Sequence, residues 1–130
     1  MKPTIRLRTS VQLFSLFTLF CSSILFAQDV QLDFDYFKNE VQPIFLSKRE
    51  GNVRCIQCHT RSSGFRIQPL EDHQLFWTDE QSRMNFDSAA SFSLAGEDPL
   101  RSRFLTHPLA YDAGGDPFHG GGKHFDSQFD

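Results

Sequence analysis

The stretch Cys55-Ile56-Gln57-Cys58-His59 carries more chemical information than any other part of this sequence. Two thiols three positions apart lie on one side of a single helical turn, where both can bond to the same flat group. A Cys-x-x-Cys pair followed directly by histidine is the pattern of c-type haem attachment, in which the thiols add to the two vinyl groups of one porphyrin. The next residue then presents its imidazole to the iron as the proximal ligand. The stretch therefore predicts one covalent haem c bound to Cys55 and Cys58, with His59 as an axial ligand.

Three other interpretations of the cysteine pair fit the sequence less well. A structural zinc site needs two more ligands, and no second pair of cysteines or histidines follows at the spacing of a zinc motif. A thioredoxin-like redox pair precedes a helix in a βαβ unit, whereas no strand pattern is evident here. A plain disulfide between Cys55 and Cys58 leaves His59 without a role.

The N-terminus has the pattern of a secretory signal peptide. Lys2, Arg6 and Arg8 form a basic start, an apolar run extends from Val11 to Phe26, and Ala27 precedes a polar stretch. We expect cleavage after residue 27, which leaves residues 28–130 as one exported domain in the periplasm or outside a bacterial cell, without a membrane span. The alternative is an uncleaved membrane anchor, although the run is short and serine-interrupted for a spanning helix.

Charge changes once the predicted signal peptide is removed. The whole chain has 13 basic and 16 acidic residues. Lys2, Arg6 and Arg8 leave with the signal peptide and all the acidic residues remain, so the mature chain has 10 basic against 16 acidic residues, a formal charge of −6. Such a surface excludes nucleic acid as a partner, because phosphates require a basic footprint. It favours a basic redox partner protein through electrostatic steering.

Helical patterns outnumber all others in the mature chain. Apolar spacing predicts a helix from Asp33 to about residue 44, with Pro43 weakening its second half. A capping box formed by Thr78 and Gln81 predicts a second helix to about residue 92. A third, short helix is predicted over residues 99–106, and the Gly-rich end from residue 114 is predicted to be irregular. The predicted fold is therefore mostly α, a small cytochrome c-like domain with long irregular loops around one covalent haem.

Several segments together resemble a known family. The run Phe37-Lys-Asn-Glu-Val-Gln-Pro-Ile-Phe45, followed by the cysteine motif, resembles the planctomycete-type cytochrome c domains of exported bacterial proteins. The segments Gly96-Glu-Asp-Pro99 and His119-Gly-Gly-Gly-Lys123 resemble later segments of the same group. The resemblance covers about residues 34–126 and implies a mono-haem, exported, electron-transferring domain.

This sequence differs from the resembled group at its C-terminus. Members of the group continue past the Gly-rich segment into a C-terminal helix that packs on the N-terminal helix, whereas this sequence reaches Asp130 where that helix should begin. We therefore expect the C-terminal helix to be missing. The aromatic face of Phe34 and Phe37 on the first helix is expected to lack part of its cover.

The sixth iron ligand decides what the haem can do. The candidates in the mature chain are His73, His107, His119, His124 and Met84. Many members of the resembled group use a late methionine, and His119 falls at about that place, in a Gly-rich loop whose backbone can approach a porphyrin closely. Met84 lies inside a predicted helix, where a methionine usually fills the core. We expect His119 to be the sixth ligand, with His107, His124, Met84 or an open iron as alternatives.

Two protein ligands would saturate the iron, so the predicted function is single-electron transfer rather than enzyme catalysis. Two histidines would also give a lower potential than a His/Met pair. The alternatives are a haem enzyme or gas sensor with an open iron, or a docking module of a larger exported complex. An enzyme or sensor needs a distal acid–base group, and no such group is recognisable in the sequence by its spacing.

Overall fold

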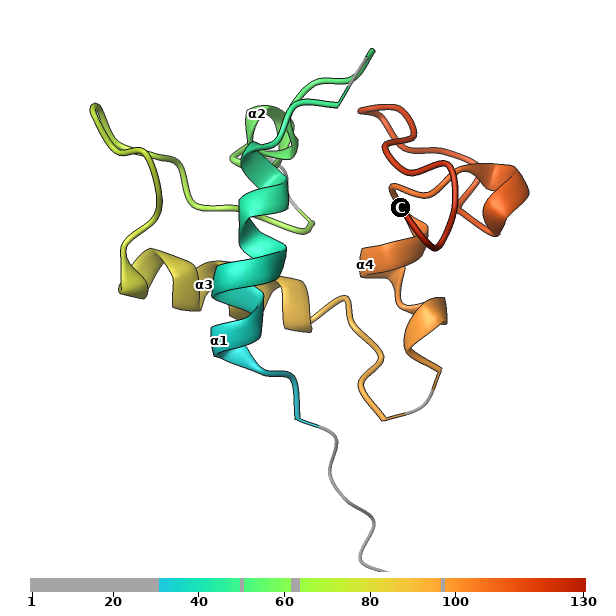
Figure 1. Cartoon of the computed structure of the whole chain (residues 1–130), viewed down its shortest axis with the longest axis horizontal. Helices are drawn as coiled ribbons and strands as arrows, with labels where there is room; N and C mark the ends of the chain where they lie inside the picture. The colour runs from blue at the N-terminus through green and yellow to red at the C-terminus, as the bar shows by residue number, and fades with distance from the viewer. Residues whose placement is uncertain (1–30, 50, 62–63, 97) are drawn as a thin grey trace, which may run out of the picture.

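The computed structural model describes residues 31–49, 51–61, 64–96 and 98–130. The predicted signal peptide over residues 1–27 lies outside these ranges. The described part consists of short helices joined by long loops (Figure 1). It contains no β-sheet, only an isolated parallel bridge between Leu109 and Phe125. The prediction of a small, mostly α fold is confirmed for this part of the chain. None of its helices has the length and apolar character needed to cross a membrane.

The first helical stretch changes its hydrogen-bonding pattern twice without a break. It comprises α1 (Phe34–Tyr36), a π-helical turn η1 (Phe37–Val41) and a 3-10 segment η2 (Gln42–Leu46). Asp33 begins the stretch as predicted, because its carboxylate accepts a hydrogen bond of 2.9 Å from the Tyr36 N–H. An ordinary α-helix cannot continue across the second half, since Pro43 has no N–H to donate.

Two further helices lie against this stretch (Figure 1). The short α2 (Cys55–His59) packs near η2, and α3 (Asp79–Ala90) crosses the first helical stretch at η1. The predicted capping box opens α3: Gln81 N–H donates to the Thr78 hydroxyl at 3.2 Å, and Thr78 N–H donates to the Gln81 side chain at 3.0 Å. This helix ends two residues before the predicted position.

The third predicted helix is divided into two. Residues 99–106 form η3 (Pro99–Arg101) and α4 (Arg103–Thr106), with Ser102 extended between them at ψ 130°. The buried Ser102 hydroxyl accepts a hydrogen bond of 2.8 Å from the Leu94 N–H, which holds the break in place. A single-helix prediction was wrong here because this tertiary hydrogen bond has no signature in local sequence. The chain then continues through η4 (Tyr111–Ala113) into irregular loops.

An aromatic cluster forms the centre of the core. The buried apolar residues of this core are Phe37, Phe45, Ile67, Trp77 and Ala89. The Phe45 ring contacts the rings of four other aromatic residues, with centroid distances between 5.5 and 6.4 Å: Phe37, Phe65, Trp77 and Phe104. Because Phe104 belongs to α4, the Phe45 ring joins the last third of the chain to the earlier part that contains its other three neighbours.

The aromatic face of the first helical stretch is covered at Phe37, contrary to the expectation from the sequence, whereas Phe34 is partly exposed. Phe37 is only 6% exposed. The Phe86 ring of α3 packs edge-on against Phe34 and Phe37, at centroid distances of 5.6 and 5.4 Å. The Arg83 guanidinium lies 3.4 Å from the centre of the Phe34 ring. Helix α3 therefore supplies the cover that a C-terminal helix was expected to give.

A second correction concerns Met84, which the sequence placed in the core. Its side chain is 45% exposed. The face of α3 that turns inward carries the buried residues Ser82, Asn85 and Ala89, and Met84 lies off this face. Two of these three inward residues are polar. A prediction from apolar residues alone therefore turned the wrong face of α3, the one with Met84, toward the core. The Gln42 side chain, also buried, donates to the Ser82 hydroxyl at 3.0 Å.

The central place of Phe45 gives a stability prediction. Replacing Phe45 with Ala should lower the free energy of unfolding by about 3–5 kcal/mol, because a buried ring with four aromatic neighbours is lost. The same substitution at Phe129, which is 97% exposed, should change it by less than about 0.5 kcal/mol. Denaturant-induced unfolding of the mature protein measures both values. Equal losses in the two variants would contradict the central role of Phe45.

Candidate functional site

The two motif cysteines lie on α2 as free thiols. Cys55 is partly buried against the aromatic core, and Cys58 is exposed. Burial raises the pKa of the Cys55 thiol above its ordinary value. The turn is closed by a hydrogen bond of 2.8 Å from the Arg54 N–H to the Gln57 side chain. The pair is therefore presented from one helical turn with neither sulfur used in a disulfide.

His59 is oriented by a hydrogen bond from its own ring. Its Nδ1 lies 2.7 Å from the Phe65 carbonyl oxygen. Since a carbonyl only accepts, Nδ1 carries the proton and the lone pair of a neutral ring is left on Nε2. A metal-binding histidine typically fixes its tautomer in this way, with the other nitrogen free for the metal. The Ile67 N–H donates to the His59 carbonyl at 3.1 Å and holds the intervening loop against α2.

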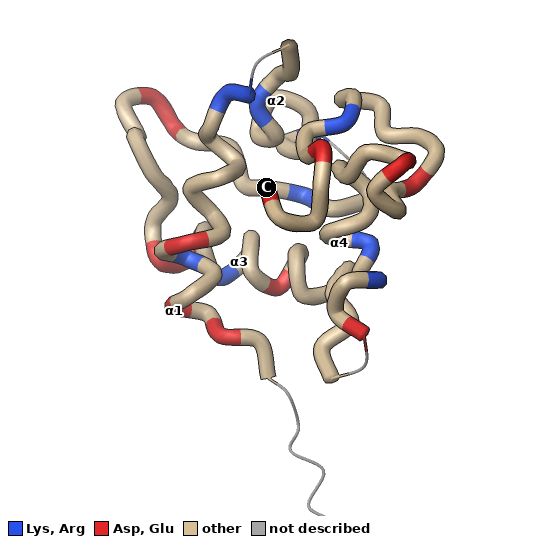
Figure 2. The backbone as a smooth tube through the Cα atoms, turned by 45° about the vertical axis from the view of Figure 1, so that its right-hand side comes forward, with Lys and Arg blue, Asp and Glu red and all other residues tan. Residues whose placement is uncertain are grey.

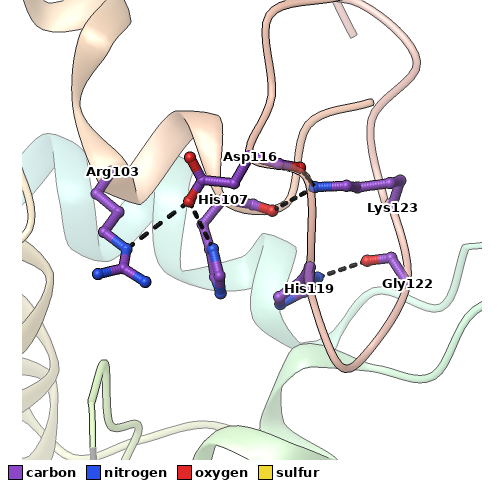
Figure 3. A network of polar contacts seen from close by, with 6 residues as sticks. All are labelled: Arg103, His107, Asp116, His119, Gly122 and Lys123. Carbon is purple, nitrogen blue, oxygen red and sulfur yellow. Dashed lines mark hydrogen bonds and ion pairs between the residues drawn. The ribbon is translucent and has the colours of Figure 1, made fainter. Parts of the chain in front are cut away.

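His119 has the same arrangement in a separate loop. Its Nδ1 lies 2.5 Å from the Gly122 carbonyl oxygen (Figure 3). As in His59, the lone pair of the neutral ring is therefore left on Nε2. The ring is nearly parallel to that of His59, with an interplanar angle of 23° and a centroid distance of 6.2 Å. The structure thus brings together two imidazoles that are 60 residues apart in the sequence.

This separation fits two imidazoles that share one metal. A metal–imidazole bond is about 2.0–2.1 Å long. The centre of a five-membered ring lies about 1.1 Å from its nitrogen, given bonds of about 1.33 Å. Two such rings in line on either side of an iron have centres roughly 6 Å apart, and the distance between the ring centres of His59 and His119 is of this size.

A haem iron takes only two ligands from the protein, because the porphyrin supplies the other four. The described residues contain no group of three or more His, Cys, Asp or Glu side chains arranged for a bare metal ion. The donor set found here is two free thiols on one turn and a facing pair of imidazoles. This set fits a covalently attached haem.

Two more histidines surround His119. The His107 ring packs against it edge-on at a centroid distance of 4.7 Å, and the His124 ring lies at 5.7 Å. His124 is buried, with 8% of its surface exposed. His73, in contrast, is an exposed loop residue with φ of 70°, as the sequence suggested. Of the candidate sixth ligands, His119 is the one whose ring lies nearly parallel to that of His59.

Burial lowers the pKa of His119 below its ordinary value, and the neighbouring histidines add to this effect. The hydrogen bond to Gly122 acts in the opposite direction but is the smaller influence. Burial, followed by the charge of Arg49, likewise lowers the pKa of His124. Both shifts favour the neutral form of the ring, which is the form that binds metals.

A polar network fixes the loop that carries His119 (Figure 3). His107 Nδ1 lies 2.8 Å from an Asp116 carboxylate oxygen, and Arg103 Nε lies 3.8 Å from the same oxygen. The Lys123 ammonium donates to the backbone carbonyls of His107 and Asp116. The network ties the segment before His119 to the segment after it, and so restrains the loop from both sides.

Glycines allow the same loop to approach the imidazoles. A Cβ at Gly121 would lie 3.4 Å from His119 Cε1 and 3.5 Å from His124 Nε2. A Cβ at Gly115 would lie 2.0 Å from the Leu109 carbonyl oxygen, which no side chain can tolerate. The Gly-rich composition recognised in the sequence therefore serves close packing of backbone and rings.

Sequence reasoning selected the cysteines, His59 and His119, and it missed their supports. Asp116 and Lys123 act through tertiary contacts. Lys123 ends the His119–Lys123 segment that carries the resemblance, but its supporting role could not be predicted from that segment. The Phe65 carbonyl, which orients His59, is a backbone group and leaves no sequence signal at all. Phe65 itself is recognisable in the sequence as an aromatic residue that could pack against a haem, and its ring lies 4.9 Å from that of His59.

Comparison with models of known protein families, with curated proteins and with solved structures finds no match for this chain. The interpretation of the site therefore depends on its own residues and their geometry.

The contrast between two glycines tests the close packing of the loop. Gly115→Ala should destabilise the mature protein by about 2–3 kcal/mol, because backbone must move to admit the new Cβ. Gly120→Ala should change the stability by less than about 0.5 kcal/mol, since nothing lies within 4 Å of a Cβ at that position. Chemical unfolding monitored by circular dichroism gives both values. If Gly115→Ala were as mild as Gly120→Ala, the packing described here would be incorrect.

Proposed function

We propose that this chain is an exported c-type cytochrome domain that transfers single electrons through one covalently attached haem. Cys55 and Cys58 would hold the porphyrin through thioether bonds, and His59 and His119 would ligate the iron. The observation that carries the proposal is the pair of nearly parallel imidazoles with centres 6.2 Å apart, each with its Nδ1 bonded to a carbonyl. The resemblance of the segments around both histidines to planctomycete-type cytochrome c domains supports it further.

The ligand pair decides between chemical roles. When bound, the haem would supply an iron that alternates between the ferric and ferrous states. With His59 and His119 on its two faces, no coordination position would remain for oxygen, peroxide or another substrate. The protein would then act by holding the iron in one ligand set during both states. Two imidazoles would give a lower potential than an imidazole and a thioether.

One observation favours a second candidate function, a haem enzyme or gas sensor. The hydrogen-bonded pair of His107 and Asp116, with Arg103 beside it, is an acid–base group close to His119. Sequence reasoning had found no such group, because its members are separated by loops. If His119 left the iron, this group would face an open coordination position. The electron-transfer role is preferred because the ring of His119, and not that of His107, lies nearly parallel to the ring of His59.

Covalent attachment is the first test of the proposal. The full chain, expressed with its N-terminal segment in a bacterium that carries a c-type maturation system, should retain haem after denaturing electrophoresis, as shown by a haem stain. The double variant Cys55→Ala, Cys58→Ala should lose the stain, because no thioether can form. Mass spectrometry of the mature protein should show an N-terminus at Gln28. Haem that separates from the denatured wild-type chain would refute covalent attachment.

Replacement of His119 tests the sixth ligand. His119→Ala should convert a low-spin absorption spectrum to a high-spin one, and the ferrous form should gain carbon monoxide binding, because one axial position opens. His119→Met should remain six-coordinate with a higher potential, since a thioether favours ferrous iron.

Two histidine variants serve as matched controls for this experiment. His107→Ala and His73→Ala should both keep the low-spin spectrum. A wild-type protein that is high-spin and binds carbon monoxide readily would eliminate the electron-carrier proposal and favour the enzyme or sensor instead. Loss of the low-spin spectrum in His107→Ala alone would reassign the sixth ligand to His107.

A further inference from the structure

The sequence around the cysteine motif has a charge opposite to that of the whole domain. Residues 48–66 contain five basic residues and one acidic residue, Glu50, whereas the rest of the mature chain contains five basic and 15 acidic residues. In Figure 2, blue stretches of the backbone lie around α2. We refer to the five basic residues as the basic collar: Lys48, Arg49, Arg54, Arg61 and Arg66.

The charges of the basic collar are available to a partner. Four of its side chains, all except Arg49, are exposed. The ion pairs formed within the described part of the chain involve other residues, so none of them neutralises the collar. Arg49 is partly buried, and its guanidinium is held 4.1 Å from the centre of the Phe125 ring. A cation–aromatic contact of this kind fixes the position of the group and leaves its charge in place.

In the sequence, the collar residues lie on both sides of the residues that would hold the haem. Arg54 directly precedes Cys55, Arg61 lies two positions after His59, and Arg66 directly follows the residue whose carbonyl orients His59. The Cys58 thiol is exposed between them. A porphyrin bonded to this sulfur would therefore be attached at an exposed position of α2, close to the basic stretches of the backbone that lie around this helix (Figure 2).

We propose that the basic collar is the docking face for an acidic redox protein, which exchanges one electron with the haem through the porphyrin edge at Cys58. This inference rests on the proposed function. In the reducing direction, one electron leaves the reduced centre of the partner and converts ferric haem iron to ferrous iron, with no other reactant. The net charge of −6 favours a basic partner, but it acts only at long range. At physiological salt the Debye length is about 8 Å, so the charges at the point of contact decide which partner docks.

A compact acidic protein fits the collar better than an extended anionic surface. Outside residues 48–66, acidic residues exceed basic residues by ten in the mature chain. A membrane or a nucleic acid that covered more than the collar would meet this excess and be repelled. A protein with one acidic patch can contact the collar alone.

The salt dependence of electron transfer distinguishes local charge from net charge. The probe is a reduced plant-type ferredoxin, an acidic one-electron donor with a potential of about −400 mV, mixed by stopped flow with the ferric cytochrome. If the collar governs docking, the second-order rate constant should fall at least about fivefold between about 10 and 150 mM salt, because screening removes an attraction. If the net charge governs it, the rate constant should rise over the same range, which would overturn the proposal.

Charge reversal at two matched arginines assigns the face. Arg61→Glu should lower the rate constant at low salt at least about threefold. Arg101→Glu, an exposed arginine outside the collar with the same change in net charge, should lower it by much less. Equal effects of the two variants would overturn the assignment of the collar. Both variants should retain the haem stain and the low-spin spectrum of the wild type.

The outcomes of these experiments separate this inference from the function on which it rests. A chain without covalent haem, or with a high-spin spectrum, fails the proposed function before any rate is measured. A low-spin cytochrome that reacts with ferredoxin faster as salt increases fails only the docking inference. The third outcome concerns membranes: flotation of the protein with phosphatidylglycerol vesicles, lost in Arg61→Glu, would assign the collar to an anionic lipid surface instead of an acidic protein.

Discussion

The contacts of the Phe45 ring set the positions of both halves of the site. One neighbour is Phe65, whose carbonyl oxygen accepts the hydrogen bond from His59 Nδ1. Another is Phe104 of α4, from which the chain continues to His107 and the loop that carries His119. The aromatic cluster therefore holds the helix with the thiols and the loop with the second imidazole at a fixed separation.

The site is supported mainly by backbone groups. Carbonyl oxygens of Phe65 and Gly122 fix the two imidazole rings, and further carbonyls hold the Lys123 ammonium. Backbone positions are set by the fold, so such supports tolerate many changes of side chain. Close backbone packing also explains Gly115, where a Cβ would press against the Leu109 carbonyl. In the proposed function, this rigidity would keep one ligand set through both oxidation states, which limits the reorganisation that electron transfer requires.

Charge in this protein has to be considered at two scales. The mature chain is acidic overall, while the stretch from residue 48 to residue 66 is strongly basic. A net charge describes solubility and the approach of a distant partner. The surface around an exposed thiol such as Cys58 is instead governed by the nearest side chains, because salt screens the others. The sequence-based expectation of a basic partner used only the first scale, whereas the proposed acidic partner is inferred from the second.

The sequence by itself determined the local features of this protein: the helical turn with two thiols and a histidine, the cap of α3 at Thr78, and the Gly-rich loop around His119. Each depends on residues a few positions apart, whose geometry follows from backbone chemistry. Only the tertiary structure decided that α3 covers the first helical stretch, that Met84 lies exposed, and that Ser102 divides a helix. It also decided the approach of His119 to His59. These features depend on contacts between residues far apart in the chain, and local pattern contains no information about which distant surfaces meet.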